Sequence, residues 1–207
     1  MKGLYIVTPD WDDTDRLVQV TEQALRGGAA IVQYRHKTAS PALRREQAAA
    51  LLALCRRHQR PLIINDHLDL CLELEADGLH VGGTDAPVAQ IREELGADKI
   101  VGASCYGDLE LAKKACREGA TYVAFGGFYP SRVKKYPVTT PVSIIAESKA
   151  LIPLPVVVIG GMTVENSRPL VAAGAEMVAA ISSVYMSESP QRAAQEFASI
   201  CSERHQS

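Results

Sequence analysis

The chain has 207 residues, of which 47% are hydrophobic and 22% are charged, an ordinary composition for one folded domain. Its formal net charge is −2 and it has no long basic block, so nucleic acid is not an expected partner. No apolar run is long enough to span a bilayer, and the sequence starts without the basic and apolar segments of a secretory signal. The five cysteines are widely spaced without a C-x-x-C pair, which disfavours disulfides and zinc and predicts a cytoplasmic location.

Short apolar runs alternate with helix-like segments along the whole chain. The runs expected to form strands are residues 4–8, 31–32, 62–64, 79–81, 100–101, 122–125, 156–159 and 178–181. The segments expected to form helices are residues 14–26, 41–57, 68–74, 87–95, 109–118, 143–150, 165–173 and 191–202. The runs are apolar on both faces, as in parallel strands that are covered on both sides. This eightfold alternation predicts an α/β fold, a single-domain (β/α)8 TIM barrel over residues 1–207, with a doubly wound open sheet as the alternative.

Polar residues follow most of the apolar runs, and in a barrel these strand ends meet at the rim that holds active sites. Gln33, Arg35 and Lys37 occupy alternate positions after the second run, so strand periodicity directs all three to the same side. Two cations and an amide can hold a polyanion, with the arginine supplying a fork of donors. A solvated loop is the competing interpretation, and it weakens because other strand ends carry compatible residues.

Carboxylates follow the third and fourth runs. Asn65 and Asp66 end the third run, and Asp85 comes shortly after the fourth. Two carboxylates that converge at one rim, together with waters and a phosphorylated ligand, suit Mg²⁺, which rarely has an all-protein cage. Each aspartate taken alone is more typical of a helix cap or a turn.

Small residues follow the seventh and eighth runs, at Gly160-Gly161 and Ser182-Ser183. The loops after these two strands commonly bind phosphate in barrels through backbone N–H groups, and tight turning is the alternative explanation. After the sixth run a longer segment reaches Pro141 and carries Arg132 and Lys134. It is expected either to close over a ligand or to be a solvated basic loop.

Two further side chains are weaker candidates. His80 lies inside an apolar run, which is more typical of a core histidine with satisfied nitrogens than of a ligand. Cys105 follows the fifth run, but no histidine is placed nearby in the sequence to activate it as a nucleophile.

Together these segments resemble the thiamine phosphate synthase family over nearly the whole chain. The resemblance rests on the Q-x-R-x-K pattern at 33–37, the Asn-Asp pair at 65–66, and the segments 78–82, 102–104, 159–161 and 181–182. It implies the barrel fold and a transferase reaction. In that reaction 4-amino-5-hydroxymethyl-2-methylpyrimidine diphosphate joins a thiazole phosphate, giving thiamine phosphate and pyrophosphate by a Mg²⁺-assisted dissociative displacement.

The resemblance also implies site residues. The residues implied around the pyrimidine diphosphate are Gln33, Tyr34, Arg35, His36, Lys37, Asn65, Ser104 and Lys134. The implied Mg²⁺ ligands are Asp66 and Asp85, and the implied contacts of the thiazole phosphate are Gly161, Ile181 and Ser182. The segment Ser131-Arg132-Val133-Lys134 is implied to contact substrate as well. The implied catalytic residues are Arg35, Lys37, Ser104 and Lys134, which would stabilise the departing pyrophosphate.

Some positions differ from the commonest family pattern. His36 replaces a usual glutamate, Tyr106 stands where histidine is frequent, and Gly83-Thr84 replaces a Gln-Glu pair. The segment 131–134 replaces T-x-T-K and loses its second hydroxyl, for which Arg132 is expected to compensate.

Other functions remain open at this level. A thiazole tautomerase-like barrel shares the thiazole phosphate site but has no need to ionise a diphosphate. A non-catalytic barrel would bind a phosphorylated ligand for regulation. A phosphate-binding isomerase would need a general acid/base pair, and no convincing pair stands at the strand ends. The expected partners are small-molecule substrates, with no membrane or nucleic acid, and the oligomeric state, including a homo-oligomer, is left open.

Overall fold

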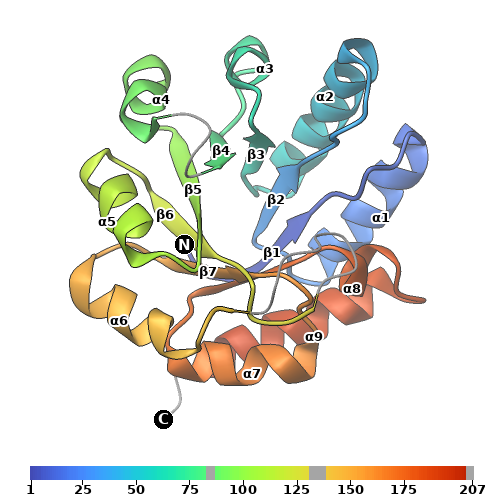
Figure 1. The fold of residues 1–207 in the computed structure, drawn as a ribbon. Coiled ribbons are helices and arrows are strands. Elements are labelled where there is room, and N and C mark those ends of the chain that lie inside the picture. Colours follow the sequence, from blue (N-terminus) through green and yellow to red (C-terminus); the bar gives the residue numbers. More distant parts are fainter. Residues whose placement is uncertain (83–86, 131–138, 204–207) are drawn as a thin grey trace.

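A computed structural model describes residues 1–82, 87–130 and 139–203 of the chain. Eight parallel strands form a closed barrel in the order of the sequence, and helices surround it (Figure 1). The barrel closes because β1 (Gly3–Val7) pairs in parallel with β8 (Met177–Ala180). The predicted (β/α)8 barrel is therefore confirmed, and the open sheet is excluded.

The remaining elements follow the expected alternation. The other strands are β2 (Ile31–Tyr34), β3 (Leu62–Asn65), β4 (Gly78–Gly82), β5 (Ile100–Tyr106), β6 (Tyr122–Phe125) and β7 (Val156–Ile159). The helices that match expected segments are α1 (Thr14–Arg26), α2 (Pro41–Arg57), α3 (Leu68–Glu73), α4 (Val88–Leu95), α5 (Leu109–Arg117), α6 (Ser143–Leu151), α7 (Val164–Ala173) and α9 (Pro190–Glu203). One helix was not expected, the single turn α8 (Ser182–Tyr185), which is too short to produce a helical period in the sequence.

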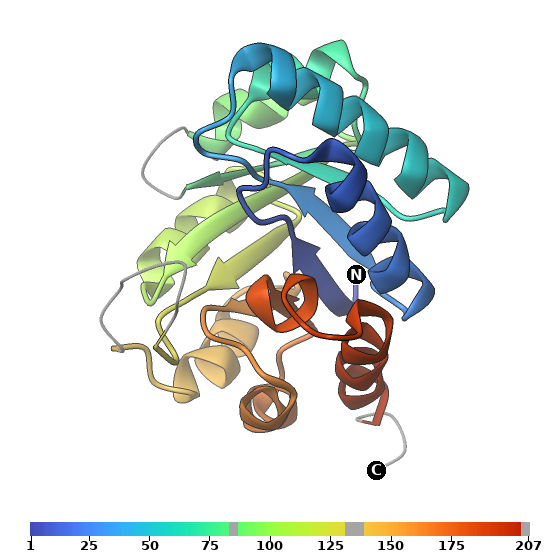
Figure 2. The ribbon, with the colours of Figure 1, turned by 90° about the vertical axis from the view of Figure 1, so that its right-hand side faces the viewer.

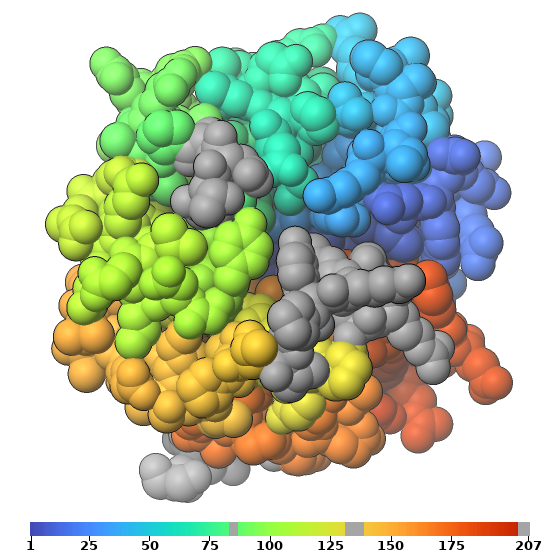
Figure 3. Space-filling model, viewed as in Figure 1, coloured from blue at the N-terminus to red at the C-terminus, as the bar shows by residue number. Residues whose placement is uncertain are grey.

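Successive strand–helix units occupy successive sectors of the barrel. In Figure 3 the colours run once around the face of the molecule in the order of the sequence. Figure 2 shows the same arrangement from the side, with helices packed along the outside of the strands. Among the helices of residues 1–82, 87–130 and 139–203, none is long and apolar enough to cross a membrane.

Local sequence signals fix where several helices begin. Ser40 precedes α2 in an extended conformation and its hydroxyl accepts from the N–H of Leu43 at 3.2 Å, with Pro41 at the first helical position. Thr163 and Asn166 form a reciprocal capping box at the start of α7. These caps satisfy N–H groups that have no partner within the helix.

Two apolar layers hold the fold together. Alternate strand residues such as Leu4 and Val32 point outward and pack against the helices in the larger cluster. The intervening residues fill the barrel interior and are Tyr5, Val7, Ile31, Ile63, Tyr122, Ala124, Val157, Met177 and Ala179. Each fully buried aliphatic side chain contributes about 1.5–3 kcal/mol, which explains why both faces of the strands are apolar. Polar interior residues gather toward the carboxyl ends of the strands.

Candidate active site

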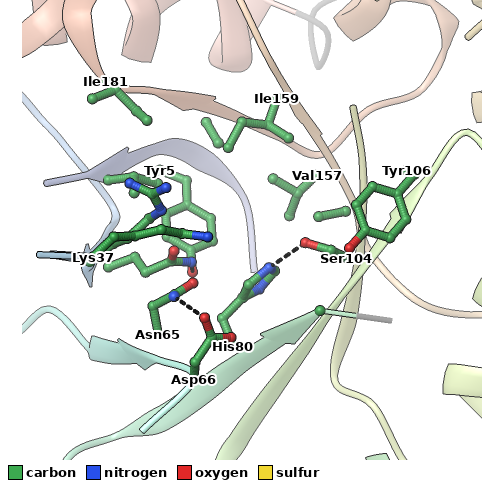
Figure 4. A pocket seen from close by; sticks show the side chains of 16 residues that line it. Tyr5, Lys37, Asn65, Asp66, His80, Ser104, Tyr106, Val157, Ile159 and Ile181 are labelled. Carbon is green, nitrogen blue, oxygen red and sulfur yellow. Dashed lines mark hydrogen bonds between the residues drawn. The ribbon is translucent and has the colours of Figure 1, made fainter. Parts of the chain in front are cut away.

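A cavity of about 300 Å³ lies among the carboxyl ends of the strands. Its polar lining is formed by Gln33, Arg35, Lys37, Asn65, Asp66, His80 and Ser104, together with the hydroxyls of Tyr5 and Tyr106. Figure 4 shows the labelled polar side chains turned toward the space between the strands. This is the rim at which barrel enzymes carry their active sites.

The alternate residues Gln33, Arg35 and Lys37 all line this cavity, as strand periodicity predicts. Tyr34 and His36, the residues between them, do not line it. They lie instead on a smaller adjoining cavity of about 170 Å³ that shares Lys37, Asn65 and Asp66 with the larger one. The Tyr34 hydroxyl donates to Gln47 Oε1 at 3.0 Å, and His36 Nε2 lies 3.1 Å from Asp12 Oδ1.

The loop after β1 fixes the basic segment in place. The N–H of Arg35 donates to Thr8 Oγ1 at 2.8 Å, and the Thr8 hydroxyl donates back to the Arg35 carbonyl at 2.9 Å. Asp10 accepts from the Lys37 N–H at 3.0 Å and lies 3.5 Å from Arg35 Nη1. The Arg35 side chain is only 9% exposed, so this carboxylate partly offsets the cost of burying its charge. The Arg35 guanidinium and the Lys37 backbone are thus held at the cavity before any ligand binds.

Asp66 sits in a backbone conformation that is uncommon for a residue with a side chain, with φ of +64°. Its N–H donates to the His80 carbonyl at 2.9 Å, which ties the turn to β4. Its Oδ2 accepts from Asn65 Nδ2 at 2.7 Å, shown as a dashed line in Figure 4. The Asn65 amide therefore holds the Asp66 carboxylate at the cavity.

The Asp66 carboxylate fits Mg²⁺ in part. Mg²⁺ usually takes one or two carboxylates and completes its shell with water and substrate phosphates. Asp85, the second expected ligand, lies outside the described residues. Within the part of the chain that the structure describes, no three His, Cys, Asp or Glu side chains converge as a metal site.

His80 and Ser104 form the floor of the cavity on the β4 and β5 side. His80 Nε2 lies 2.8 Å from Ser104 Oγ, and His80 Nδ1 lies 2.8 Å from the Tyr122 hydroxyl. The expectation of a histidine with satisfied nitrogens is confirmed, yet the same ring also lines the cavity. Strand alternation could have predicted that His80 faces the barrel interior. Its neighbours Leu79 and Val81 point outward toward the helices, so His80 has to point inward.

The opposite wall of the cavity is apolar. Its side chains come from β6, β7, β8 and the residue after β8, and they are Ala124, Val157, Ile159, Ala179 and Ile181. Figure 4 places Val157, Ile159 and Ile181 across from Asn65, Asp66 and Lys37. A flat heterocycle can therefore pack on one wall while its charged substituent faces the other.

Not all expected site residues lie on the described cavity. Ile181 lines it, whereas Gly161 and Ser182 are absent from its lining. Gly161 turns the chain after β7 with φ of +63°, and Ser182 begins the short helix α8. The remaining expected residues lie outside the described part of the chain and are Ser131, Arg132, Val133 and Lys134.

Cys105 points away from the cavity into the layer between strands and helices. Burial raises the pKa of its thiol to about 12, so it is protonated near neutral pH. The expectation that Cys105 is not an activated nucleophile agrees with this environment.

The cavity at the carboxyl ends of the barrel strands combines cations, a carboxylate and an apolar wall. This arrangement is typical of a (β/α)8-barrel enzyme that binds a phosphorylated heterocyclic ligand. The sequence model for thiamine monophosphate synthase matches residues 4–184. The chain belongs to this family and is, like its relatives, a transferase of thiamine synthesis.

Individual relatives agree with the family assignment. The chain is 62% identical to the thiamine-phosphate synthase of Janthinobacterium sp. (strain Marseille) over 97% of each protein. It is 48% identical to that of Nitrosospira multiformis over 88% of this chain and 78% of the relative. Its fold matches the structure of the thiamine phosphate pyrophosphorylase from Pyrococcus furiosus with a TM-score of 0.83, at 30% identity, over 97% of this chain and 96% of the other.

Proposed function

We propose that this cavity joins 4-amino-5-hydroxymethyl-2-methylpyrimidine diphosphate to a thiazole phosphate, giving thiamine phosphate and pyrophosphate. The observation that carries the proposal is the meeting of Gln33, Arg35, Lys37, Asp66 and Ser104 around one space. Each comes from the end of a strand or from the loop after it, so the barrel itself positions them. The family assignment supports the same reaction.

The diphosphate lies against the basic side of the cavity in this proposal. The Arg35 guanidinium offers a planar fork of donors, and Lys37 adds a compact charge at the rim. Asn65 and the Ser104 hydroxyl supply neutral hydrogen bonds to the same substrate. Lys134 is proposed to complete this set from outside the described residues. Because Thr8 and Asp10 hold Arg35 before binding, its guanidinium can stabilise negative charge with little reorganisation as that charge develops.

A magnesium ion held by Asp66 and Asp85 would neutralise part of the diphosphate charge and improve pyrophosphate as a leaving group. The donor chemistry fits, because carboxylate and amide oxygens are the ligands that this cation prefers. Asn65 Nδ2 donates to Asp66 Oδ2 at 2.7 Å, and this hydrogen bond holds the carboxylate without any contribution from the cation.

The chemical step is a substitution at the methylene carbon of the pyrimidine. The bond between this carbon and the diphosphate oxygen breaks, and its electron pair leaves with pyrophosphate. The electron-rich aminopyrimidine stabilises the positive charge on the methylene, and the thiazole nitrogen donates the electron pair of the new C–N bond. Arg35, Lys37 and the apolar wall act by charge stabilisation, orientation and exclusion of water, and no enzyme nucleophile is needed.

The thiazole phosphate is proposed to bind at the ends of β7 and β8. Gly161, Ile181 and Ser182 would contact its phosphate, with Ser131, Arg132 and Val133 completing the contacts from outside the described residues. Ile181 supports this placement because it lines the cavity next to the apolar wall. The thiazole nitrogen would then face the pyrimidine methylene across the cavity.

The assay is release of pyrophosphate from the purified protein with each substrate alone and with both, in the presence and absence of Mg²⁺. We expect release only with both substrates and Mg²⁺, together with thiamine phosphate as product. Asp66→Asn should lower the rate on the order of a hundredfold or more, because the carboxylate charge is lost at the leaving group. Asp98→Asn is the matched control, since Asp98 is exposed in the loop before β5, at the opposite end of the barrel.

The other readings predict different results in this assay. A tautomerase would convert the thiazole phosphate without the pyrimidine and without releasing pyrophosphate. A regulatory barrel would bind the substrates and form no product. Equal rates for Asp66→Asn and Asp98→Asn would remove Asp66 from the mechanism.

A further inference from the structure

A continuous line of hydrogen bonds runs along the inner side of the cavity, where four of its five residues belong to the lining, and its two ends are Gln33 and Ser104. Gln33 Nε2 donates to the Tyr5 hydroxyl at 2.8 Å, and this hydroxyl lies 2.6 Å from that of Tyr122. The Tyr122 hydroxyl lies 2.8 Å from His80 Nδ1, and His80 Nε2 lies 2.8 Å from Ser104 Oγ. The line therefore connects strands β2, β1, β6, β4 and β5 through the barrel interior.

Both tyrosines in this line keep their protons. Tyr5 and Tyr122 are 1% and 0% exposed, and burial raises the pKa of each phenol above its usual value. Each phenol therefore has one hydrogen to donate and an oxygen that can accept. A neutral imidazole has one nitrogen that donates and one that accepts. Every hydrogen in the line thus has to be assigned consistently with its neighbours.

The Gln33 amide sets the direction of the whole line. Because Gln33 Nε2 donates to Tyr5, the Tyr5 hydrogen goes to Tyr122, and the Tyr122 hydrogen goes to His80 Nδ1. His80 then carries its hydrogen on Nε2 and donates it to Ser104 Oγ. If His80 instead carried a hydrogen on Nδ1, one of the two tyrosine hydrogens would have no acceptor within the line. Leaving a buried hydroxyl hydrogen without an acceptor is costly, which disfavours that arrangement.

The direction has consequences at the two ends. Ser104 Oγ already accepts from His80, so the Ser104 hydroxyl hydrogen is available to a ligand in the cavity. One amide N–H of Gln33 donates to Tyr5, and the Gln33 side-chain carbonyl oxygen can accept from a ligand. Ser104 thus offers a ligand a donor, and Gln33 offers it an acceptor.

We propose that this line is a positioning device, in which Tyr122 and Tyr5 hold His80 in its Nε2–H tautomer so that Ser104 donates to the substrate while Gln33 accepts from it. The proposal rests on the proposed function and deepens it. A ligand that matches these ends carries an N–H donor and a ring nitrogen acceptor on the same heterocycle, as an aminopyrimidine does. Tyr122 does not line the cavity and acts through the residues that it contacts.

The packing around Tyr122 agrees with a fixed position. Its ring stacks on His80 with centroids 5.7 Å apart and meets Tyr5 edge to face at 5.8 Å. A Cβ atom at Gly102 would lie 2.1 Å from the Tyr122 Cζ atom, so the absence of a side chain at Gly102 gives this ring its space. Buried polar groups are costly unless they form hydrogen bonds, and the packing inside the barrel holds Tyr122 where its hydroxyl forms them.

The test compares Tyr122→Phe with Tyr185→Phe in the full chain. Tyr185 is an equally buried tyrosine whose hydroxyl bonds to Thr21 Oγ1 at 2.9 Å in the helical layer, so it controls for loss of a buried hydroxyl. We expect Tyr122→Phe to raise the KM for the pyrimidine diphosphate about tenfold, from one weakened polar contact to the ring. The KM for the thiazole phosphate and the Kd of inorganic pyrophosphate with Mg²⁺ should stay within twofold of wild type.

A second measurement reads the tautomer directly. In protein labelled with ¹⁵N-histidine, the His80 resonances, assigned by their loss in His80→Asn, should show the Nε2–H form in the wild type. Tyr122→Phe should populate the Nδ1–H form, and Tyr185→Phe should not. An Nδ1–H form in the wild type, equal effects of the two tyrosine variants, or equal weakening of both substrates and pyrophosphate would overturn the proposal. Failure of the wild type to form thiamine phosphate would instead reject the proposed function, because the tautomer is measured without substrate.

Discussion

Replacement of Gly102 by alanine tests how tightly the interior of the barrel is built around Tyr122. A Cβ atom at this position would lie 2.1 Å from the Cζ atom and 2.2 Å from the hydroxyl oxygen of Tyr122. The ring cannot move away freely, because it packs against both Tyr5 and His80. The steric conflict therefore has to be absorbed by the backbone of β5 or by the loss of these contacts.

The expected cost follows from two opposing terms. Overpacking of a well-filled core costs about 1–3 kcal/mol, and more where the structure cannot relax. The backbone at Gly102 has no positive φ, so alanine also restricts the unfolded chain and stabilises by about 0.4–1 kcal/mol. The net loss in free energy of unfolding should be about 1–2 kcal/mol, measured by urea unfolding with an unchanged slope.

A double-mutant cycle separates this contact from other causes. Tyr122→Leu removes the Cζ atom and the hydroxyl, so Gly102→Ala should cost at least about 1 kcal/mol less in that background. Gly126→Ala is the matched control, since its nearest contact would be an ordinary 3.5 Å from Ile159 Cγ2. Additive costs in the cycle, or equal costs for the two glycine substitutions, would refute the steric argument.

Three further predictions concern charge and burial. Lys37→Ala should raise the KM for the pyrimidine diphosphate about tenfold and leave that for the thiazole phosphate unchanged. The control Lys114→Ala, at an exposed lysine of helix α5, should alter neither KM, and equal shifts of both KM values in Lys37→Ala would contradict the assignment. Burial raises the pKa of Cys105 to about 12 and that of Cys71 to about 11, against 9.0 for a free thiol. Above pH 9 the unfolded chain therefore binds fewer protons than the folded chain, and the free energy of unfolding should fall as the pH rises toward 11. Cys105→Ala should flatten this decline in denaturation curves, and an unchanged slope would speak against it. Arg92→Met should lower the free energy of unfolding by about 2 kcal/mol without changing either KM, because the guanidinium donates to backbone carbonyls of neighbouring loops.

The sequence predicts the fold well because each strand–helix unit carries its own local signals. Helix α2 illustrates this, with a serine cap and a proline at the expected start. The closed barrel follows from repetition of such units and from strands that are apolar on both faces. Helix α8 was missed because four residues form only one turn.

The site is predictable where strand alternation applies. Alternation correctly directs Gln33, Arg35 and Lys37 to the cavity, and the same rule sends Tyr34 and His36 to the other side of the strand. The family resemblance treats all five as one group and does not make this distinction. Applying alternation to every strand would also have brought His80 into the site.

The hydrogen-bonded line could not be predicted in the same way. Tyr5 and Tyr122 lie in apolar runs and are 117 positions apart, so nothing local marks them as partners. Their contact depends on closure of the barrel and on the space at Gly102, which is set by the pairing of β5 with β6. Long-range polar networks of this kind require the three-dimensional structure.

The most direct test of the central claim is a crystal structure of the protein with Mg²⁺, pyrophosphate and thiamine phosphate. We expect pyrophosphate against Arg35 and Lys37, a Mg²⁺ ion at Asp66, and the product's pyrimidine between Gln33 and Ser104. Pyrophosphate bound with its cation away from Asp66, or a pyrimidine that touches neither of those two side chains, would contradict it.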